Sequence, residues 1–110
     1  MHKLYLDLET YSSIPIASAG SWRYFESPDY EILLIGWALD DSPVQVTDLA
    51  SGESLPDWFL PALHDPNYIK VAHNAAFEIG GLSKVYGPMD ISQWRGTMLL
   101  GLYAGCTASL

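Results

Sequence analysis

Hydrophobic and polar residues alternate at the start of the chain. Within residues 3–9, leucines occupy positions 4, 6 and 8, and polar or aromatic residues occupy positions 5, 7 and 9. Successive side chains of a strand point to opposite faces, so this period of two predicts a β-strand with one apolar face. The other face carries the carboxylates of Asp7 and Glu9, which a buried strand accommodates only if they are paired, solvated or bound to a cation.

Three further segments have the pattern of strands. Residues 31–39 form an apolar run, and residues 44–48 alternate with period two after the turn sequence DDSP. Two such runs joined by a tight turn predict an antiparallel hairpin. Residues 68–72, with the sequence YIKVA, predict another short strand.

Helical spacing is found in residues 74–85. Positions 75, 78, 82 and 85 recur three or four residues apart, Asn74 can cap the first turn, and Gly87-Pro88 ends the segment. We also expect helices near residues 17–25, from about 54 to 63 with Pro61 in the first turns, and over residues 97–103. This order of elements is typical of an α/β fold, a mixed sheet flanked by helices.

The composition fits one small globular domain. Of 110 residues, 49% are hydrophobic and 16% are charged, which allows one modest core and argues against disorder. No apolar run approaches the roughly 20 residues needed to cross a bilayer, and acids stand where a signal peptide needs its apolar core. The single cysteine, Cys106, leaves no partner for an internal disulfide. We expect a soluble, cytoplasmic protein without a membrane partner.

The net charge bears on nucleic-acid binding. The chain has 13 Asp and Glu residues against 5 Lys and Arg residues, a formal charge of -8. Phosphate binding normally depends on cationic side chains that release counterions. An acidic protein can still act on nucleic acid if its carboxylates hold divalent metal ions and another domain supplies the grip. A metal-dependent nuclease therefore stays open, and a stand-alone DNA-binding protein is disfavoured.

Asp7 and Glu9 have the spacing of a metal-binding pair. Two positions apart on a strand, they project from the same face with Cα atoms about 6.6 Å apart. Hard cations such as Mg²⁺ or Mn²⁺ prefer oxygen ligands, and two ions about 3.5 to 4 Å apart can activate water and stabilise the leaving oxygen of a phosphodiester. An equally open interpretation is that both acids lie at a solvated strand end.

A third acid follows the strand expected over residues 68–72. In VAHNAAFE, residues 71–78, the strand leads into a helix that Asn74 would cap, and Glu78 lies one turn in. Open α/β sheets usually bind ligands at this end of their strands. A capping residue followed by an acid is also ordinary helix electrostatics, and Phe77 is more typical of a core than of base stacking.

These segments resemble nuclease motifs. LYLDLETYS, with motif I at residues 4–10, and VAHNAAFE, motif II at residues 71–78, are similar to the first two motifs of the DEDD 3′-to-5′ exonuclease superfamily. EILLIGWALDD, VQVTDLASGESLP and QWRGTMLLGLYAG resemble the N-terminal proofreading domain of phage and prophage family A DNA polymerases. The resemblance covers essentially the whole chain. It implies an RNase H-like fold, a five-stranded mixed sheet with the first strand central and the hairpin beside it.

The resemblance also implies a site. The acids that would bind two Mg²⁺ or Mn²⁺ ions and carry the hydrolysis are Asp7, Glu9 and Glu78. The residues that would contact the 3′ end of single-stranded DNA are Thr10, through its backbone, and Asn74 and Phe77, which would shape the pocket. Most relatives have Asp where Glu78 stands, and the longer side chain would shift or loosen a metal. The intact protein would continue into a polymerase domain.

The family's third motif has no counterpart in residues 1–110. In relatives it supplies a last metal-binding Asp and a Tyr or His general base, after the helix that begins here at Thr97. We do not expect His2, His64 or His73 to replace it. The expectation is therefore the N-terminal part of an exonuclease domain, either a natural truncation or a piece of a longer polymerase, with little or no activity by itself.

Three alternatives stay open. A ribonuclease of the same superfamily would carry the same motifs, since they do not encode the choice of sugar. A non-catalytic remnant would bind partners, including a second copy, through apolar surface that the absent third motif leaves exposed. The last alternative is an α/β domain whose acidic residues match the motifs by coincidence. Among the aromatic residues, Tyr11 and Trp22 are the candidates for base stacking.

Overall fold

The structure, a computed structural model, describes residues 1–96. The helix expected over residues 97–103, as well as Cys106, lies outside this range. The elements follow the chain in the order β1 (His2–Tyr11), α1 (Ile16–Glu26), β2 (Glu31–Leu39), β3 (Gln45–Asp48), the 3-10 turn η1 (Leu49–Ser51), α2 (Phe59–Leu63), β4 (Tyr68–Ala72), α3 (Ala75–Tyr86), the 3-10 turn η2 (Ile91–Gln93) and β5 (Trp94–Gly96).

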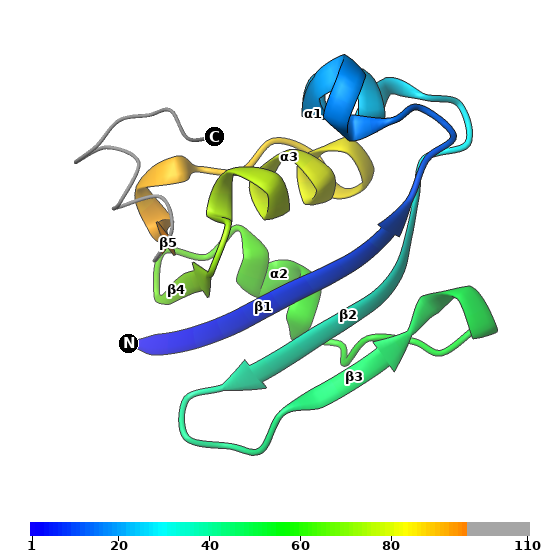
Figure 1. Ribbon diagram of the computed structural model, residues 1–110. Coiled ribbons are helices and arrows are strands. Elements are labelled where there is room, and N and C mark those ends of the chain that lie inside the picture. The colour runs from blue at the N-terminus through cyan, green and yellow to red at the C-terminus, as the bar shows by residue number, and fades with distance from the viewer. Residues whose placement is uncertain (97–110) are drawn as a thin grey trace.

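The strands form one mixed sheet in the order β3-β2-β1-β4-β5. β1 pairs antiparallel with β2 and parallel with β4, so it is the central strand, as expected. The β2–β3 hairpin lies on one side of it, and the parallel pair β4–β5 lies on the other (Figure 1). The α/β class and the five-stranded mixed sheet are therefore confirmed.

One face of the sheet is covered by the helices (Figure 1). The side chains that face them from the sheet include Leu4, Leu6, Leu8 and Ile35, and those from the helices include Phe59, Leu63, Ala75 and Leu82. All of these are 6% exposed or less. The period of two in the β1 sequence therefore predicts the buried face of this strand correctly. Within residues 1–96 the opposite face stays open, since Tyr5 is 41% and Val46 is 61% exposed.

The expected bounds hold best for the long or continuous segments. β2 and β4 have the bounds that the pattern predicts, whereas β1 and α3 extend slightly further. α2 begins only at Phe59, since the residues before it form turns, and Pro61 lies in its first turn as expected. α1 is interrupted at Gly20, whose φ of 86° is not helical. Val85 shares the helical spacing of residues 75, 78 and 82, but its side chain is 50% exposed, and Tyr86 packs against the core instead.

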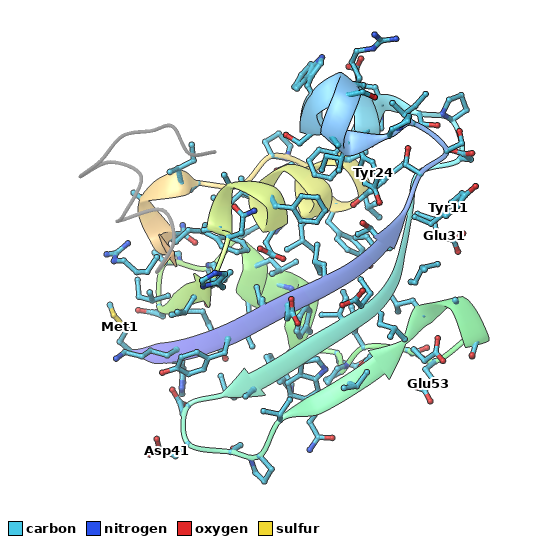
Figure 2. The ribbon with its side chains drawn as sticks, in the orientation of Figure 1. Met1, Tyr11, Tyr24, Glu31, Asp41 and Glu53 are labelled. Carbon is cyan, nitrogen blue, oxygen red and sulfur yellow. The ribbon has the colours of Figure 1, made fainter. Side chains whose placement is uncertain are left out.

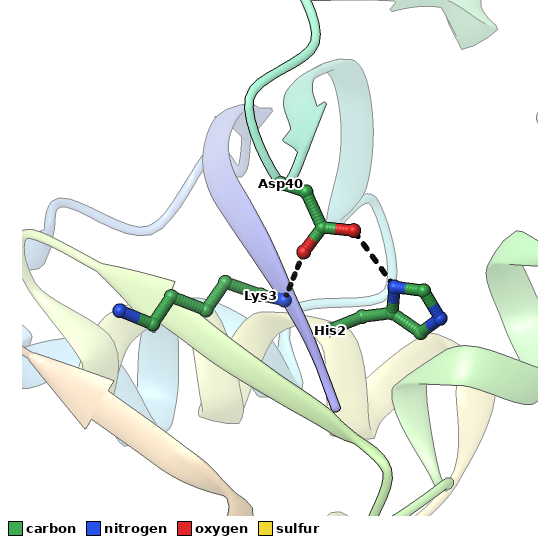
Figure 3. A network of polar contacts seen from close by, with 3 residues as sticks. All are labelled: His2, Lys3 and Asp40. Atoms are coloured by element: carbon green, nitrogen blue, oxygen red, sulfur yellow. Dashed lines mark hydrogen bonds and ion pairs between the residues drawn. The ribbon is translucent and has the colours of Figure 1, made fainter.

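Asp40 links the start of β1 to the β2–β3 hairpin through hydrogen bonds. Its Oδ2 accepts a hydrogen bond from His2 Nδ1 at 2.7 Å, and its Oδ1 accepts one from the backbone N–H of Lys3 at 2.8 Å (Figure 3). The bond from His2, followed by the one from Lys3, holds the pKa of the Asp40 carboxyl below its usual value. Asp40 has a φ of 52°, a left-handed conformation that Asp tolerates better than most residues.

Lys70 of β4 is a buried structural lysine. Its Nζ donates hydrogen bonds to the carbonyl oxygens of Ala62 and Asp65 at 3.0 and 3.2 Å, and to Gln93 Oε1 at 2.6 Å. Burial lowers the pKa of its ammonium group to about 8. The side chain thereby links the end of α2 and the η2 turn to the sheet.

No helix in residues 1–96 has the length and apolar character needed to cross a membrane.

Candidate functional site

The candidate site forms where β1 extends beyond its neighbour β4. The two strands pair only along residues 2–5 of β1 and 68–71 of β4, while β1 continues to Tyr11. After β4 the chain passes through His73 and Asn74 into α3. One edge of β1, level with Asp7 and Glu9, therefore faces the first turns of α3 instead of another strand.

Glu78 of α3 lies against this free edge. Its side chain is 5% exposed, and its Oε2 accepts a long hydrogen bond from the backbone N–H of Leu8 at 3.4 Å. Leu8 is the residue between Asp7 and Glu9. The third acid therefore reaches the strand segment that carries the other two.

The Glu78 carboxyl is poorly solvated. Burial, with a smaller contribution from the negative charge of Asp7, raises its pKa to about 7, against the opposing effect of the Leu8 hydrogen bond. Its Oε1 is buried and has no hydrogen-bond partner within the described part of the chain. A buried carboxylate oxygen without a donor is stabilised by a proton or a cation. The chemistry of this oxygen therefore suits a hard divalent metal ion.

Asp7 and Glu9 are exposed on the open face of the sheet. Neither forms an ion pair with any residue from 1 to 96. Gly36 lies opposite Asp7 on β2, and a Cβ built there would be 3.6 Å from the backbone oxygen of Asp7 and 3.8 Å from its Cβ. The glycine therefore leaves the Asp7 side chain uncovered on the β2 side.

The three carboxylates do not yet form a closed site. No group of three or more His, Cys, Asp or Glu side chains in residues 1–96 is gathered closely enough to hold one metal ion. Asp7 and Glu9 project from the open face, whereas Glu78 approaches the strand from its edge. The carboxylate oxygens, including the buried Glu78 Oε1 that lacks a hydrogen-bond partner, are ligands that suit a divalent cation. For all three acids to bind the same cation, their side chains would have to move closer together.

Thr10 follows a break in the strand register. The pairing of β1 with β2 shifts between Glu9 and Thr10, which locally bends and twists a strand. The Thr10 hydroxyl forms a hydrogen bond of 2.8 Å with the Tyr24 hydroxyl of α1, and Figure 2 shows Tyr24 below that helix. The hydroxyl is thus engaged with α1, and the contact of substrate with the Thr10 backbone stays a prediction.

Asn74 and Phe77 hold the start of α3. Asn74 is the N-cap residue, but the predicted side-chain cap is wrong: its side chain makes no capping bond, and its backbone oxygen accepts the N–H groups of Phe77 and Glu78 at 3.0 and 3.2 Å. The ring centroid of Phe77 lies 5.1 Å from that of Phe25. Phe77 thus has the packing expected of a core residue, and its contact with substrate stays a prediction.

The contacts of α3 with Phe25 of α1 and with Tyr30, just before β2, were not foreseen from the sequence. A Cβ built at Gly80 would lie 2.6 Å from the Phe25 ring, and one at Gly81 would lie 2.6 Å from the Tyr30 hydroxyl, which donates to the Gly81 carbonyl. Only glycine allows this approach without a shift of the rings. The signal that could have found it is the Gly-Gly pair inside a helical pattern. This contact positions the helix that carries Glu78.

The protonation of Glu78 predicts a pH-dependent stability. Because its pKa is about 7 in the folded chain and 4.5 ordinarily, the folded state binds the proton more tightly. The stabilisation that proton binding by Glu78 gives to the folded state is complete below about pH 4.5 and is lost as the pH rises through about 7. Its total contribution to the free energy of unfolding is about 3 kcal/mol. We expect Glu78→Gln to abolish this slope in the free energy of unfolding, measured by urea denaturation from pH 4.5 to 8.

The matched control is Asp41→Asn in the exposed β2–β3 turn, which should keep the wild-type slope. Parallel slopes for wild type and Glu78→Gln would mean that Glu78 is already ionised and solvated in the folded chain.

Comparison with known proteins finds a sequence relative. The chain is 41% identical over 111 residues to a protein named DNA polymerase from Bacillus phage SP02, and the match covers 100% of this chain and 17% of that relative. The chain thus spans about a sixth of the relative's length. No protein-family model and no solved structure matches it. The expected similarity to a phage DNA polymerase is confirmed, over a segment of that protein.

Proposed function

We propose that the chain carries part of the active site of a metal-dependent 3′-to-5′ exonuclease, the proofreading domain of a phage-type DNA polymerase. The observation that carries the proposal is the bond between Glu78 and the backbone of Leu8, midway between Asp7 and Glu9. The similarity of the whole chain to a segment of a phage DNA polymerase supports the same context. In the longer protein, a polymerase domain would follow.

The topology supports an RNase H-like fold. A central strand flanked by an antiparallel hairpin on one side and parallel strands on the other is the sheet that this fold implies. In such a sheet the acids of the central strand and the acid of the following helix lie at the same end. The proposed fold and the proposed site therefore rest on the same strand, β1.

Each acid has its own task in the proposed site. Asp7 and Glu9 are fixed by the central strand, so they define where Mg²⁺ or Mn²⁺ would be held. Once bound, such ions activate a water molecule for attack on the phosphodiester and stabilise the leaving oxygen. Glu78 contributes an oxygen that lacks a hydrogen-bond donor, so a cation would relieve its desolvation. The acids also repel phosphate until they are neutralised, which makes substrate binding depend on metal.

The proposed substrate is the 3′ end of single-stranded DNA. Its terminal nucleotide would approach the backbone at Thr10, with Asn74 and Phe77 at the border of the pocket. A chain with a formal charge of -8 has too few cationic side chains to bind a long polyanion by itself. We therefore assign the cationic contacts with the DNA phosphates to another domain of the longer protein.

A manganese titration of the 110-residue chain tests the proposal. We expect Mn²⁺ to bind and to be displaced by Mg²⁺, with binding lost in Glu78→Gln and retained in the control Asp41→Asn. Electron paramagnetic resonance of free Mn²⁺ measures the binding directly. Equal Mn²⁺ binding by the two variants, or none by the wild type, would contradict the proposed site. In the longer protein, release of nucleotides from matched DNA and RNA oligonucleotides then separates an exonuclease on DNA from the related ribonuclease.

The second candidate is a non-catalytic interaction domain of the same fold. It is favoured by the apolar residues on the open face, of which Val44 is 73% and Val46 is 61% exposed. The same titration separates the two candidates, because an interaction domain has no reason to bind Mn²⁺ through Glu78.

A further inference from the structure

The last part of β1 has fewer strand partners than the first part. Within residues 1–96, β4 pairs with β1 only along residues 2–5 of β1, so Thr10 has no β4 neighbour. On the other edge, the pairing of β1 with β2 shifts between Glu9 and Thr10 and skips Leu33. Such a shift disrupts the hydrogen-bond ladder locally. The backbone at Thr10 is therefore held less firmly by the sheet than the residues before it.

Tyr24 of α1 supplies a contact that the sheet does not. Its hydroxyl forms a hydrogen bond of 2.8 Å with the hydroxyl of Thr10. Figure 2 shows Tyr24 between α1 and the end of β1. The bond joins α1 to the strand at the residue that directly follows Glu9, on the far side of the register shift. It therefore fixes the strand where its own pairing is weakest.

The ring that carries this hydroxyl is held in an aromatic cluster. Its centroid lies 5.7 Å from that of Phe25, 5.9 Å from that of Tyr30 and 6.2 Å from that of Phe77. Aromatic rings at such distances attract one another, and a ring in contact with three others has few positions open to it. Phe77 belongs to α3, the helix that carries Glu78. Tyr24 therefore connects the two elements, β1 and α3, that carry the acids of the proposed site.

We propose that Tyr24 is a positioning residue of the exonuclease site, which holds the backbone at Thr10 in place for the 3′-terminal nucleotide. The inference rests on the proposed function, because the approach of the nucleotide to Thr10 is part of it. A backbone that is already ordered binds a ligand more tightly, since no ordering has to accompany binding. Tyr24 acts through Thr10, so its hydroxyl should matter for substrate binding and not for the chemistry at the metal ions.

A purely structural role of this hydroxyl has a different consequence. If the bond between Tyr24 and Thr10 only stabilised the fold, its loss would lower the free energy of unfolding and leave substrate binding unchanged. A contact made equally with the substrate and with the transition state affects KM and leaves kcat unchanged. The separation of KM from kcat therefore distinguishes the two roles.

The test uses the longer, polymerase-containing protein, with a single-stranded DNA oligonucleotide and Mg²⁺. Tyr24→Phe removes the hydroxyl and keeps the ring, and Thr10→Val removes the partner hydroxyl and keeps the branched shape. We expect each variant to raise KM about fivefold, as the loss of one hydrogen bond typically does, with kcat within about twofold of the wild type. Thr10→Ser keeps a hydroxyl and should retain the wild-type KM.

Tyr68→Phe is the matched control. Tyr68 is half-buried, as Tyr24 is, but it lies at the start of β4, opposite His2 at the other end of β1. Its loss of a hydroxyl should leave KM unchanged. The double variant Tyr24→Phe/Thr10→Val should raise KM no further than either single variant, because both changes remove the same bond.

Two results would overturn the role of Tyr24 alone. One is a KM for Tyr24→Phe equal to that of Tyr68→Phe, in a protein whose nucleotide release still depends on Asp7. The other is a double variant whose effect on KM is the product of the two single effects, which would mean that the hydroxyls act separately. Nucleotide release that is absent, or that is independent of Asp7, would instead contradict the proposed function and this inference with it.

Discussion

In the longer, polymerase-containing protein, replacing Asp7 by Asn is expected to lower the proposed Mg²⁺-dependent release of 3′ nucleotides by at least about 100-fold. Asn keeps the size of the side chain and removes its charge, so the sheet should not change. Asp7 lies on the central strand, where pairing with β2 holds its backbone, and Gly36 opposite it leaves its carboxylate open. The measurement is the rate of mononucleotide release from a single-stranded oligonucleotide, in the presence of Mg²⁺ or Mn²⁺.

Asp41→Asn is the control for this experiment. It removes one negative charge from the exposed turn that follows β2 and should leave the rate unchanged. Both substitutions remove one carboxylate charge, and Asp41 lies in the turn between β2 and β3 (Figure 2). If the Asp7→Asn and Asp41→Asn proteins released nucleotides at the same rate, the activity would not use the assigned acids.

The second large effect concerns stability. Replacing Phe59 by Ala is expected to lower the free energy of unfolding by about 3 to 5 kcal/mol. Phe59 is fully buried, and its ring lies 5.9 Å from that of Trp37 on β2 and 5.7 Å from that of Trp58. A small domain has a total stability of about 5 to 15 kcal/mol, so this one change removes a large part of it. Urea denaturation followed by tryptophan fluorescence measures the loss.

Leu60→Ala serves as the comparison for Phe59→Ala. The two residues are neighbours on α2, but Leu60 is 39% exposed, so its truncation should cost less than about 1.5 kcal/mol. Similar losses for the two variants would show that α2 does not pack on the sheet through Phe59.

The fold was predictable where a single segment carries its own pattern. The alternation in β1 and the apolar runs of β2 and β4 each contain enough residues to show a period or a continuous core, and the structure confirms all three. β5 has only three residues, one of them Gly96, which is too few for any pattern. The start of α2 was placed too early because turns can hold the same residues as a first helical turn.

The residues of the candidate site could be proposed from the sequence, but their geometry could not. The period of two put Asp7 and Glu9 on one face, and the position of Glu78 after β4 suggested the third acid. The approach of Glu78 to β1 depends on how far β1 extends beyond its pairing with β4, and no local sequence pattern encodes this length. The same holds for Tyr24, whose partner Thr10 is 14 residues away, and for the buried Lys70, which looked like an ordinary strand residue.

The short link between β4 and α3 sets a limit on how this protein can evolve. Only His73 and Asn74 separate the two elements. An inserted or deleted residue there would turn Glu78 by about 100° around the helix axis and direct it away from β1. The residues between β3 and α2 bear no such constraint, so related proteins should vary in length there and keep a constant spacing between β4 and α3.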